Sequence, residues 1–582
     1  MKKFFIIIAF ILIATSTCFA GDYYIAQTDT GAANGTSCAN ANAIADLTWG
    51  VGNNVKAGDT LHLCGTITTK LTIGDSGSEG LPITIKFESG AKLSAAYWGD
   101  AASAAIYGSS KNYIIIDGGT NGIIEATNNG SASLGYANQV DSRAIETSGC
   151  SNLEIKNLTI QNMYIREADS ADSFEGAYAI VITGGSNISV HDNVLNNCET
   201  GIGFVYPGSA TSSTWSVYNN TITAASNGIT VGSGNTNAIL NGCSIYNNTI
   251  NLGQTWSGDW APPPGDGHKH NDGIQIWSTQ TGSEITSLLI YNNSIGPDMG
   301  YYDDAGTPTS QTTAWIFLEG KITSPKVFNN LITSIGNSYP TNAYVYLKDA
   351  GYGLANPSAY NNTIVAGGGG AGFQADTTVG ATIKNNIYSG SGIFSVENGL
   401  GSFISNYNNI YGTSTVQVSF KRFTYDSGSG TWTNCEAVTC TSGGTAIFFR
   451  KDDTPGTIEL RGISGTCASG DTVAGATGSV ALTNNGTMVE YANYTLAGWQ
   501  STDCQDANSV TGDPLLNGDY TLATNSPAKW AGTATTQLST TDKSGNPWHS
   551  PPSMGAYEYT GNTTLGSGST FTLGSGAGFT LQ

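Results

Sequence analysis

A short pattern of alternating apolar and polar positions, interrupted by two asparagines, returns along most of the chain. In each copy an apolar residue and an aromatic or polar residue precede the asparagine pair, and further strand-forming residues follow it. Clear copies lie at residues 217–222, 245–250, 290–295, 327–332, 359–364 and 383–388, and weaker copies start at Ile155, Val190 and Asn406. Alternation with a period of two residues is typical of a half-buried β-strand. Each copy therefore predicts a strand, a polar turn and a second strand.

The spacing of the copies predicts how these strands stack. Successive copies start 35, 27, 28, 45, 37, 32, 24 and 23 residues apart, so the basic coil has 23 or 24 residues and longer steps carry loops. Such a coil cannot bury its apolar face alone, but stacked coils can, through parallel strands about 4.8 Å apart. The turn asparagines are expected to stack from coil to coil, since Asn tolerates left-handed backbone angles and its amide can bond turn backbone groups. A propeller blade needs about 40 residues, so an all-β parallel solenoid is favoured over a propeller or a sandwich.

The same pattern divides the chain into segments. Residues 1–20 combine a basic start, the apolar run 4–13 and a small residue, Ala20, which is typical of a signal peptide cleaved after Ala20. Residues 21–56 are expected to cap the open end of the solenoid, and residues 57–412 to form its coils. Residues 413–480 lack the asparagine pattern and predict an inserted β-rich module. Residues 481–560 predict C-terminal coils or a cap, and residues 561–582 a Gly/Ser-rich tail.

Motifs at both ends of the solenoid carry a family resemblance. They are Ala57–Leu63, Leu71–Ile73, Gly80–Phe87 and Gly90–Leu93 near the start, and Asp513–Leu516, Ser526–Ala528 and Gly555–Tyr559 near the end. With these motifs the chain resembles the right-handed parallel β-helix (pectate-lyase-like) superfamily of secreted proteins, over roughly residues 22–411 and 481–559. The resemblance implies a right-handed β-helix, with β-elimination or hydrolysis of polysaccharides as the expected chemistry, although the superfamily also holds proteins with no known chemistry.

Charge and hydropathy narrow the range of partners. The chain of 582 residues has a formal net charge of -21, which argues against nucleic acid because phosphates would be repelled. The same charge is compatible with bound calcium. After the signal peptide no segment is long and apolar enough to cross a membrane. We therefore expect a bacterial protein that is secreted or attached to the cell surface, with a polysaccharide or surface glycan as its partner.

Nine cysteines follow the expected cleavage site, so at least one of them must be free. In an oxidising compartment disulfides are expected. The candidate pairs are Cys38 with Cys64 in the cap and first coil, and Cys435 with Cys440 and Cys467 with Cys504 in the C-terminal part. Cys150, Cys198 and Cys243 lie in the coils, where buried thiols are expected.

A second repeated segment precedes each asparagine pair and predicts an outward surface. Its copies run over residues 201–205, 228–232, 273–277, 315–319, 344–348 and 372–376. If the second and fourth positions point inward, the third and fifth point outward and form columns across the coils. The outward residues are small in the early coils (Gly203, Val205, Thr230, Gly232) and large later: Gln275, Phe317, Tyr346 and Gln374 in one column, and Trp277, Glu319, Lys348 and Asp376 in the other.

These columns suit a sugar ligand. Aromatic rings stack on pyranose faces, and charged groups bond hydroxyls or carboxylates. Trp315 and Tyr344 are expected to flank the columns. The candidate substrate-binding residues are therefore Trp277, Trp315, Tyr344, Tyr346, Phe317 and Gln275.

The longest steps add loops beside these columns. The step of 45 residues brings in residues 254–269, and His270 to Gly273, which include Asp272, lead from there into the outward segment. The next loop carries Asp303 and Asp304, which together with Asp376 offer oxygen ligands for calcium. Simpler interpretations remain open: Asp272 as a turn residue, or Glu319 and Lys348 as a surface ion pair.

Two classes of function fit these residues. The first is an enzyme acting on an extracellular polysaccharide, such as a uronic-acid polymer. A lyase needs a base for the proton next to a carboxyl group, for which Lys348 and His270 are candidates. A glycoside hydrolase needs two carboxylates, for which Glu319 and Asp272 are candidates. The second class is a non-catalytic glycan-binding adhesin or spike-like β-helix. Titratable groups that converge beside aromatic residues would favour the enzyme.

Overall fold

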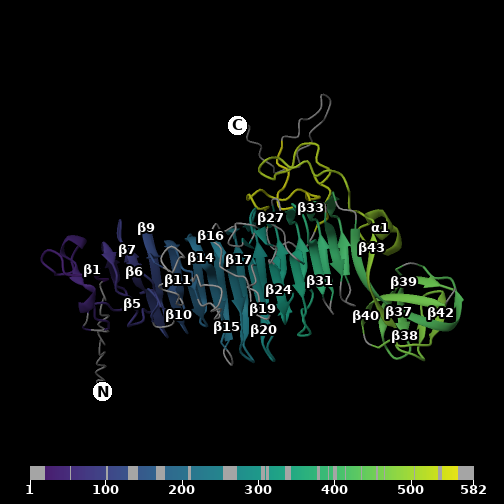
Figure 1. The fold of residues 1–582 in the computed structure, drawn as a ribbon, viewed down its shortest axis with the longest axis horizontal. Helices are drawn as coiled ribbons and strands as arrows, with labels where there is room; N and C mark the ends of the chain where they lie inside the picture. The colour runs from purple at the N-terminus through teal and green to yellow at the C-terminus, as the bar shows by residue number, and fades with distance from the viewer. Residues whose placement is uncertain are drawn as a thin grey trace, which may run out of the picture.

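The computed structural model describes residues 20–561 except 51, 53, 100–102, 129–141, 165–176, 208–210, 253–271, 300, 303–307, 310–312, 335–341, 377–379, 391, 398–402, 413–414, 434, 454–455, 465, 504 and 535–539. The expected signal peptide and tail thus lie almost entirely outside the described residues. Parallel strands stack into a long solenoid, and an antiparallel module follows at its far end (Figure 1). Among the described residues no helix could span a bilayer.

Three parallel sheets wind around one interior. The first sheet contains β5 (Leu71–Thr72), β8 (Ile106–Ser109), β10 (Arg143–Ser148), β12 (Tyr178–Thr183), the second halves of β14 (Val194–Val205) and β16 (Thr221–Gly232), β19 (Ile274–Ser278), β24 (Ala314–Gly320), β28 (Ala343–Lys348), β31 (Ala371–Asp376) and β34 (Ile393–Glu397). The second contains β1 (Asp22–Ala26), β3 (Thr60–Leu63), β6 (Ile83–Phe87), the first halves of β9 (Ile114–Ala126) and β11 (Leu153–Gln161), β13 (Ser186–His191), β15 (Thr211–Tyr218), β17 (Ile239–Tyr246), β20 (Glu284–Tyr291), β25 (Ile322–Thr323), β26 (Lys326–Phe328), β29 (Ser358–Tyr360), β32 (Ala381–Lys384) and β35 (Phe403–Asn406).

The third sheet lies after the asparagine turn of each coil. It contains β4 (Thr66–Ile67), β7 (Lys92–Ala95), the remaining halves of β9, β11, β14 and β16, β18 (Thr249–Asn251), β21 (Ser294–Ile295), β27 (Leu331–Thr333), β30 (Thr363–Val365), β33 (Ile387–Ser389) and β36 (Asn409–Tyr411). A separate antiparallel pair is formed by β22 (Tyr301–Tyr302) and β23 (Pro308–Thr309).

Burial explains why these residues form strands. In β19, for example, Ile274 and Ile276 are fully buried while Gln275 and Trp277 are partly exposed, which is the alternation of a half-buried strand. Isoleucine, leucine and valine side chains from all three sheets join in one continuous interior cluster. The all-β solenoid that the repeat predicted is confirmed.

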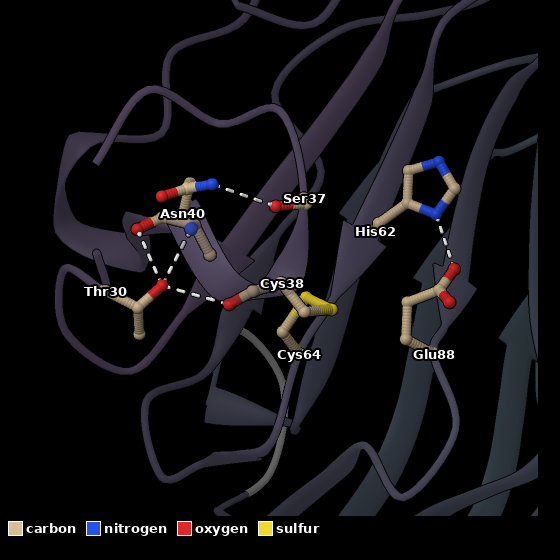
Figure 2. Close-up of a disulfide and its surroundings, with 8 residues drawn as sticks. Thr30, Ser37, Cys38, Asn40, His62, Cys64 and Glu88 are labelled. Carbon is tan, nitrogen blue, oxygen red and sulfur yellow. Dashed lines mark hydrogen bonds and ion pairs between the residues drawn. A yellow bond between two sulfur atoms is a disulfide. The ribbon is translucent and has the colours of Figure 1, made fainter. Parts of the chain in front are cut away.

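The N-terminal segment covers the first coil and is held by a disulfide. It contains a 3₁₀ turn η1 (Cys38–Asn40), β2 (Asn42–Ala43) and a second turn η2 (Ile44–Asp46). Cys38 bonds to Cys64 next to β3, which confirms the predicted pair (Figure 2). On β3, two residues before Cys64, the His62 ring lies 2.6 Å from Glu88 through Nδ1 (Figure 2) and 3.0 Å from Asp22 through Nε2. The cap is thus tied to β3 covalently and by side-chain contacts.

A ladder of asparagines runs along the solenoid: it contains the second asparagine of six pairs, with Asn193 at one end and Asn408, the first of its pair, at the other. From coil to coil the side-chain Nδ2 donates to the next Oδ1 at 3.0–3.2 Å, through Asn193, Asn220, Asn248, Asn293, Asn330, Asn362, Asn386 and Asn408. Each Oδ1 also accepts from the backbone N–H of the preceding ladder residue, and each Nδ2 also bonds a backbone carbonyl of the coil before it. All eight side chains are buried. The ladder therefore satisfies turn backbone groups that would otherwise be buried without partners.

The first asparagine of these six pairs has a different role. Asn219, Asn247, Asn292, Asn329, Asn361 and Asn385 all have φ between 54° and 57°. This left-handed region is several-fold enriched in Asn among non-glycine residues, which explains why both positions of the pair are asparagine. Just before the pair, rings stack from coil to coil at 4.5–5.3 Å, through His191, Tyr218, Tyr246, Tyr291, Phe328 and Tyr360.

Beyond the last coil the strands become antiparallel. The module consists of β37 (Thr415–Gly430), β38 (Ala437–Cys440), β39 (Thr445–Asp452), β40 (Thr457–Ser464), β41 (Thr472–Ala474), β42 (Gly478–Leu482) and β43 (Thr487–Tyr494), followed by α1 (Leu496–Asp503). It has its own apolar core. Because β42 and β43 both pair with β37, the module extends past residue 480, where we expected the coils to return.

A disulfide inside this module corrects the predicted pairing. Cys440 bonds to Cys467, so the expected pairs Cys435 with Cys440 and Cys467 with Cys504 are wrong. The two cysteines lie 27 residues apart in sequence, and the antiparallel fold, which the sequence did not reveal, brings them together. Cys150, Cys198 and Cys243 are buried free thiols, as expected.

The C-terminal segment runs back along the asparagine turns (yellow in Figure 1, above β27 and β33). Its backbone carbonyls at Thr541, Ser553, Thr533 and Gly512 accept from the Nδ2 atoms of Asn329, Asn361, Asn385 and Asn409. Asp506 ends the ladder: its Oδ1 accepts from Asn408 Nδ2 at 3.0 Å, and its Oδ2 accepts from Trp499 Nε1 at 3.1 Å. This segment therefore covers the turn edge of the later coils.

Candidate functional site

The two outward columns expected on the first sheet are present. The backbone register pairs Gln275 with Phe317, Tyr346 and Gln374 in successive strands. It likewise pairs Trp277 with Glu319, Lys348 and Asp376. We call the outward face of β19, β24, β28 and β31 the candidate face. Parallel in-register stacking brings side chains that are 28 to 42 residues apart in sequence next to one another.

Charged groups on the candidate face contact their neighbours. Lys348 Nζ lies 2.7 Å from Glu319 Oε1 and 5.7 Å from the centre of the Phe317 ring. The Tyr346 hydroxyl donates to Asp376 Oδ2 at 2.5 Å, and Gln374 Nε2 lies 3.3 Å from both oxygens of Asp376. Two carboxylates and one ammonium thus lie in three adjacent coils, in partly exposed positions.

Trp277 is more exposed than the other aromatic residues described in the two outward columns, Phe317 and Tyr346. Its backbone is in register with Gly232 of the preceding coil. A Cβ atom on Gly232 would lie only 1.8–2.3 Å from the indole atoms Cε2, Cδ2 and Cζ2. The ring therefore rests on the Gly232 backbone with its other face turned away, and it stays partly exposed. The sequence showed that Gly232 is small, but not that its missing side chain makes room for this indole.

Phe317 and Tyr346 point outward but do not offer free ring faces. They stack on each other with centroids 5.1 Å apart and form a small cluster with Ala314, Ala343 and Ala371. Phe317 is 2% exposed and Tyr346 is 7% exposed. Their predicted role as stacking platforms for a sugar is therefore wrong, because both side chains are almost fully buried. They form an apolar base beneath the charged column.

Trp315 and Tyr344 lie inside the solenoid rather than beside the columns. Both are fully buried in the main core, where their rings meet edge to face at 5.0 Å. The Tyr344 hydroxyl lies 2.8 Å from Ser334 Oγ and donates to the Gly368 carbonyl. The prediction that they flank the surface is wrong. Trp315 and Ile316 are consecutive in β24 and both belong to the interior cluster, so strict alternation fails at the start of this strand.

Asp272 is buried directly before β19. Its Oδ1 accepts from the backbone N–H of Ala314 at 2.8 Å, and its own N–H donates to Asn227 Oδ1 at 3.1 Å. Burial, together with the nearby charge of Glu319, raises the pKa of Asp272 to about 7, although the hydrogen bond from Ala314 acts in the opposite direction. The carboxyl group is therefore protonated in a large share of molecules near neutral pH. Asn227, one coil earlier, was not among the candidates because nothing in its local sequence marks it.

The raised pKa of Asp272 predicts a pH effect on stability. Because the folded state holds this proton up to about pH 7 and the unfolded chain releases it near 3.8, the group's stabilising contribution is present below about pH 4 and is lost as the pH rises to about 7. Asp272→Asn keeps the acceptor for Ala314 and removes the titration. We expect the free energy of unfolding of the variant, relative to that of the wild type, to rise by roughly 1–3 kcal/mol between pH 4 and pH 8. Urea unfolding of both proteins at several pH values across this range measures this difference in stability. A difference that does not change with pH would contradict the prediction.

Three candidate residues lie outside the described residues: His270, Asp303 and Asp304. Asp376, the third expected calcium ligand, bonds Tyr346 and Gln374. Among the described residues no three His, Cys, Asp or Glu side chains converge as metal ligands. A cavity of about 420 Å³ lies elsewhere, on the second sheet, lined by Thr286, Ser287, Leu289, Thr323, Ser324 and Lys326, none of which is a candidate residue.

A comparison with known proteins agrees with the fold described above. Residues 97–295 match a family model described as a right handed beta helix region. Together with the parallel strands of the structure, this match shows a right-handed parallel β-helix fold, as the end motifs predicted. No curated protein sequence matches the chain.

Solved structures with a similar fold include a lyase, a polygalacturonase and a phage tailspike protein, all at low identity. Pectate lyase Pel9A is 13% identical, with 92% of this chain and 96% of that chain covered and a TM-score of 0.41. The polygalacturonase from Erwinia carotovora is 12% identical, with 61% and 88% covered and a TM-score of 0.29. A tailspike protein of E. coli bacteriophage HK620 is 10% identical, with 74% and 75% covered and a TM-score of 0.36. At these identities the likeness concerns the fold alone.

Proposed function

We propose that this protein is a carbohydrate-active β-helix protein that binds an extracellular polysaccharide on the candidate face. The observation that carries the proposal is Trp277, which rests on Gly232 and turns one indole face away from the backbone. Gln275 on the same strand and the Glu319–Lys348 pair on the next two strands supply hydrogen-bonding groups beside it. An aromatic platform flanked by charged and amide groups suits the apolar face and the hydroxyl rim of a sugar.

An extracellular location is part of the proposal. The start of the chain has the pattern of a signal peptide, and two disulfides, Cys38–Cys64 and Cys440–Cys467, are formed. Disulfides persist in oxidising compartments and are rare in the cytosol.

Of the two reactions expected from the sequence, hydrolysis fits the charges better. Glu319 is partly exposed and paired with Lys348, whereas Asp272 is buried and its burial raises its pKa to about 7. Glycoside hydrolysis uses two carboxyl groups whose surroundings differ in this way. A lyase would need Lys348 as the base that accepts the substrate's proton, but its Nζ is engaged by Glu319 Oε1 at 2.7 Å.

One observation favours the alternative, a protein that binds glycan without cleaving it. The carboxyl group of Asp272 has no exposed surface, so a substrate could reach it only after a rearrangement. Calcium held by Asp303, Asp304 and Asp376 remains a separate proposal. Cleavage assays with and without EDTA test it, since loss of activity on chelation and recovery with calcium is the expected result if the metal is needed.

Binding to a panel of polysaccharides tests the proposed function. Trp277→Ala is expected to weaken binding about 10- to 100-fold, because the stacking platform is lost. Gly232→Ala should have a similar effect, since its Cβ would occupy the place of the indole. Gly234→Ala is the matched control: a Cβ there meets nothing within 4 Å. Isothermal titration with the best glycan gives the affinities, and equal affinity of all four proteins would contradict the proposed site.

A further inference from the structure

The first sheet carries little positive charge that could hold an acidic polymer. From β8 to β34 its described strands contain two cationic residues, Arg143 and Lys348. Each lies beside a carboxylate: Arg143 Nη1 is 2.8 Å from Glu146 Oε2, and Lys348 Nζ is 2.7 Å from Glu319 Oε1. The positive charges of this sheet are therefore already neutralised by the protein itself.

Negative charge is present beside the Trp277 platform. Glu319 follows Trp277 in the outward column, and Asp376 lies two coils further on. Asp376 interacts with a hydroxyl and an amide, neither of which carries a compensating charge. Over the whole chain 43 acidic residues face 22 basic ones. A polymer with a carboxylate on every sugar would meet repulsion both locally and at long range.

Uncharged sugars suit the same groups. Carboxylates accept hydrogen bonds from sugar hydroxyls, and bonds to an ionised acceptor are stronger than neutral ones. Gln275 and Lys348 supply donors, and the indole of Trp277 supplies the apolar contact. Nothing in this arrangement calls for a charge on the ligand.

We propose that the candidate face selects uncharged polysaccharides and rejects uronic-acid polymers. The inference rests on the proposed function, that this face binds a polysaccharide, and adds the class of sugar. Glu319 and Asp376 are the residues that exclude acidic ligands, through like-charge repulsion rather than through shape.

Matched glycans test this directly. Full-length mature protein is titrated with uronic-acid oligosaccharides and with the same oligosaccharides after reduction of their carboxyl groups to alcohols, alongside neutral glucans, mannans and galactans. We expect binding only to uncharged ligands, with Kd changing less than about twofold between roughly 20 and 500 mM NaCl. The double variant Glu319→Gln, Asp376→Asn should gain about tenfold in affinity for the acidic ligands.

The outcomes separate this inference from the proposed function. Trp277-dependent binding of acidic glycans that weakens with salt overturns the selection for uncharged sugars and leaves the glycan site in place. Failure of the double variant to gain affinity for acidic ligands, while it keeps the circular dichroism spectrum of the wild type, also overturns it. Absence of binding to every ligand, or binding that Trp277→Ala does not change, overturns both. Tyr97→Ala, at an exposed aromatic residue near the other end of the solenoid, is the control for loss of a ring.

Discussion

Replacing Asn248 by Ala is expected to lower the free energy of unfolding by about 3–5 kcal/mol. The Asn248 side chain accepts from the backbone N–H and the Nδ2 of Asn220, and it donates to Asn293 Oδ1 and to the Val217 carbonyl. Alanine leaves a buried backbone N–H and a buried carbonyl without these partners, and each such group costs about 1–3 kcal/mol. It also breaks the ladder in its middle.

The preceding residue supplies the control for this prediction. Asn247 has φ of 56° and an exposed side chain, so Asn247→Gly keeps the turn and removes only surface contacts. Urea unfolding gives the overall loss of stability, and hydrogen exchange at the Asn220 amide reports on the ladder itself. Similar stability of Asn248→Ala and Asn247→Gly would show that the buried ladder adds little to the fold.

Glu319→Gln is expected to slow cleavage of the substrate glycan by about 10²- to 10⁴-fold while changing its affinity by less than about threefold. Glutamine keeps the size and a hydrogen-bonding oxygen but cannot act as nucleophile or base. Release of reducing ends under substrate saturation measures turnover, and titration of the inactive variant measures binding. This combination separates a role in chemistry from a role in sugar recognition.

Glu284→Gln is the matched control for Glu319→Gln. Glu284 also pairs with a lysine, Lys321, at 3.2 Å and is similarly exposed, but it lies on β20 of the second sheet. If both variants lose the same activity, the effect comes from stability rather than from the site. If the wild type binds glycan and cleaves none, the non-catalytic alternative replaces the hydrolase.

The fold could be predicted because its information is repeated. One copy of Val217–Ile222 would be ambiguous, but copies at intervals down to 23 residues leave few architectures that can bury their apolar positions. The outward columns followed from the same register, so Trp277, Glu319, Lys348 and Asp376 were brought together correctly. Because the strands stack in register, residues at the same position of successive copies lie side by side on the same face of the solenoid.

The features that could not be predicted depend on three-dimensional detail. Trp315 and Tyr344 were misplaced because the alternation does not hold at the start of β24 and β28, where two consecutive residues both enter the core. The ring faces of Phe317 and Tyr346 are occupied because their in-register stacking brings them within 5.1 Å of each other. The burial of Asp272 and the space above Gly232 are likewise properties of the packed coils, and no local sequence pattern encodes them.

The asparagine ladder also has a direction. Every Nδ2 from Asn193 to Asn386 donates toward the C-terminal neighbour, so the side-chain amide dipoles add along the axis, as peptide dipoles add along an α-helix. The positive end of this array is the Nδ2 of Asn408, and there the chain places a carboxylate, Asp506, instead of another amide. An ionised carboxylate accepts hydrogen bonds but donates none. Asp506 therefore ends the ladder. Its carboxylate compensates the positive end of the aligned amides, and it has no N–H that could donate to the Oδ1 of a further asparagine.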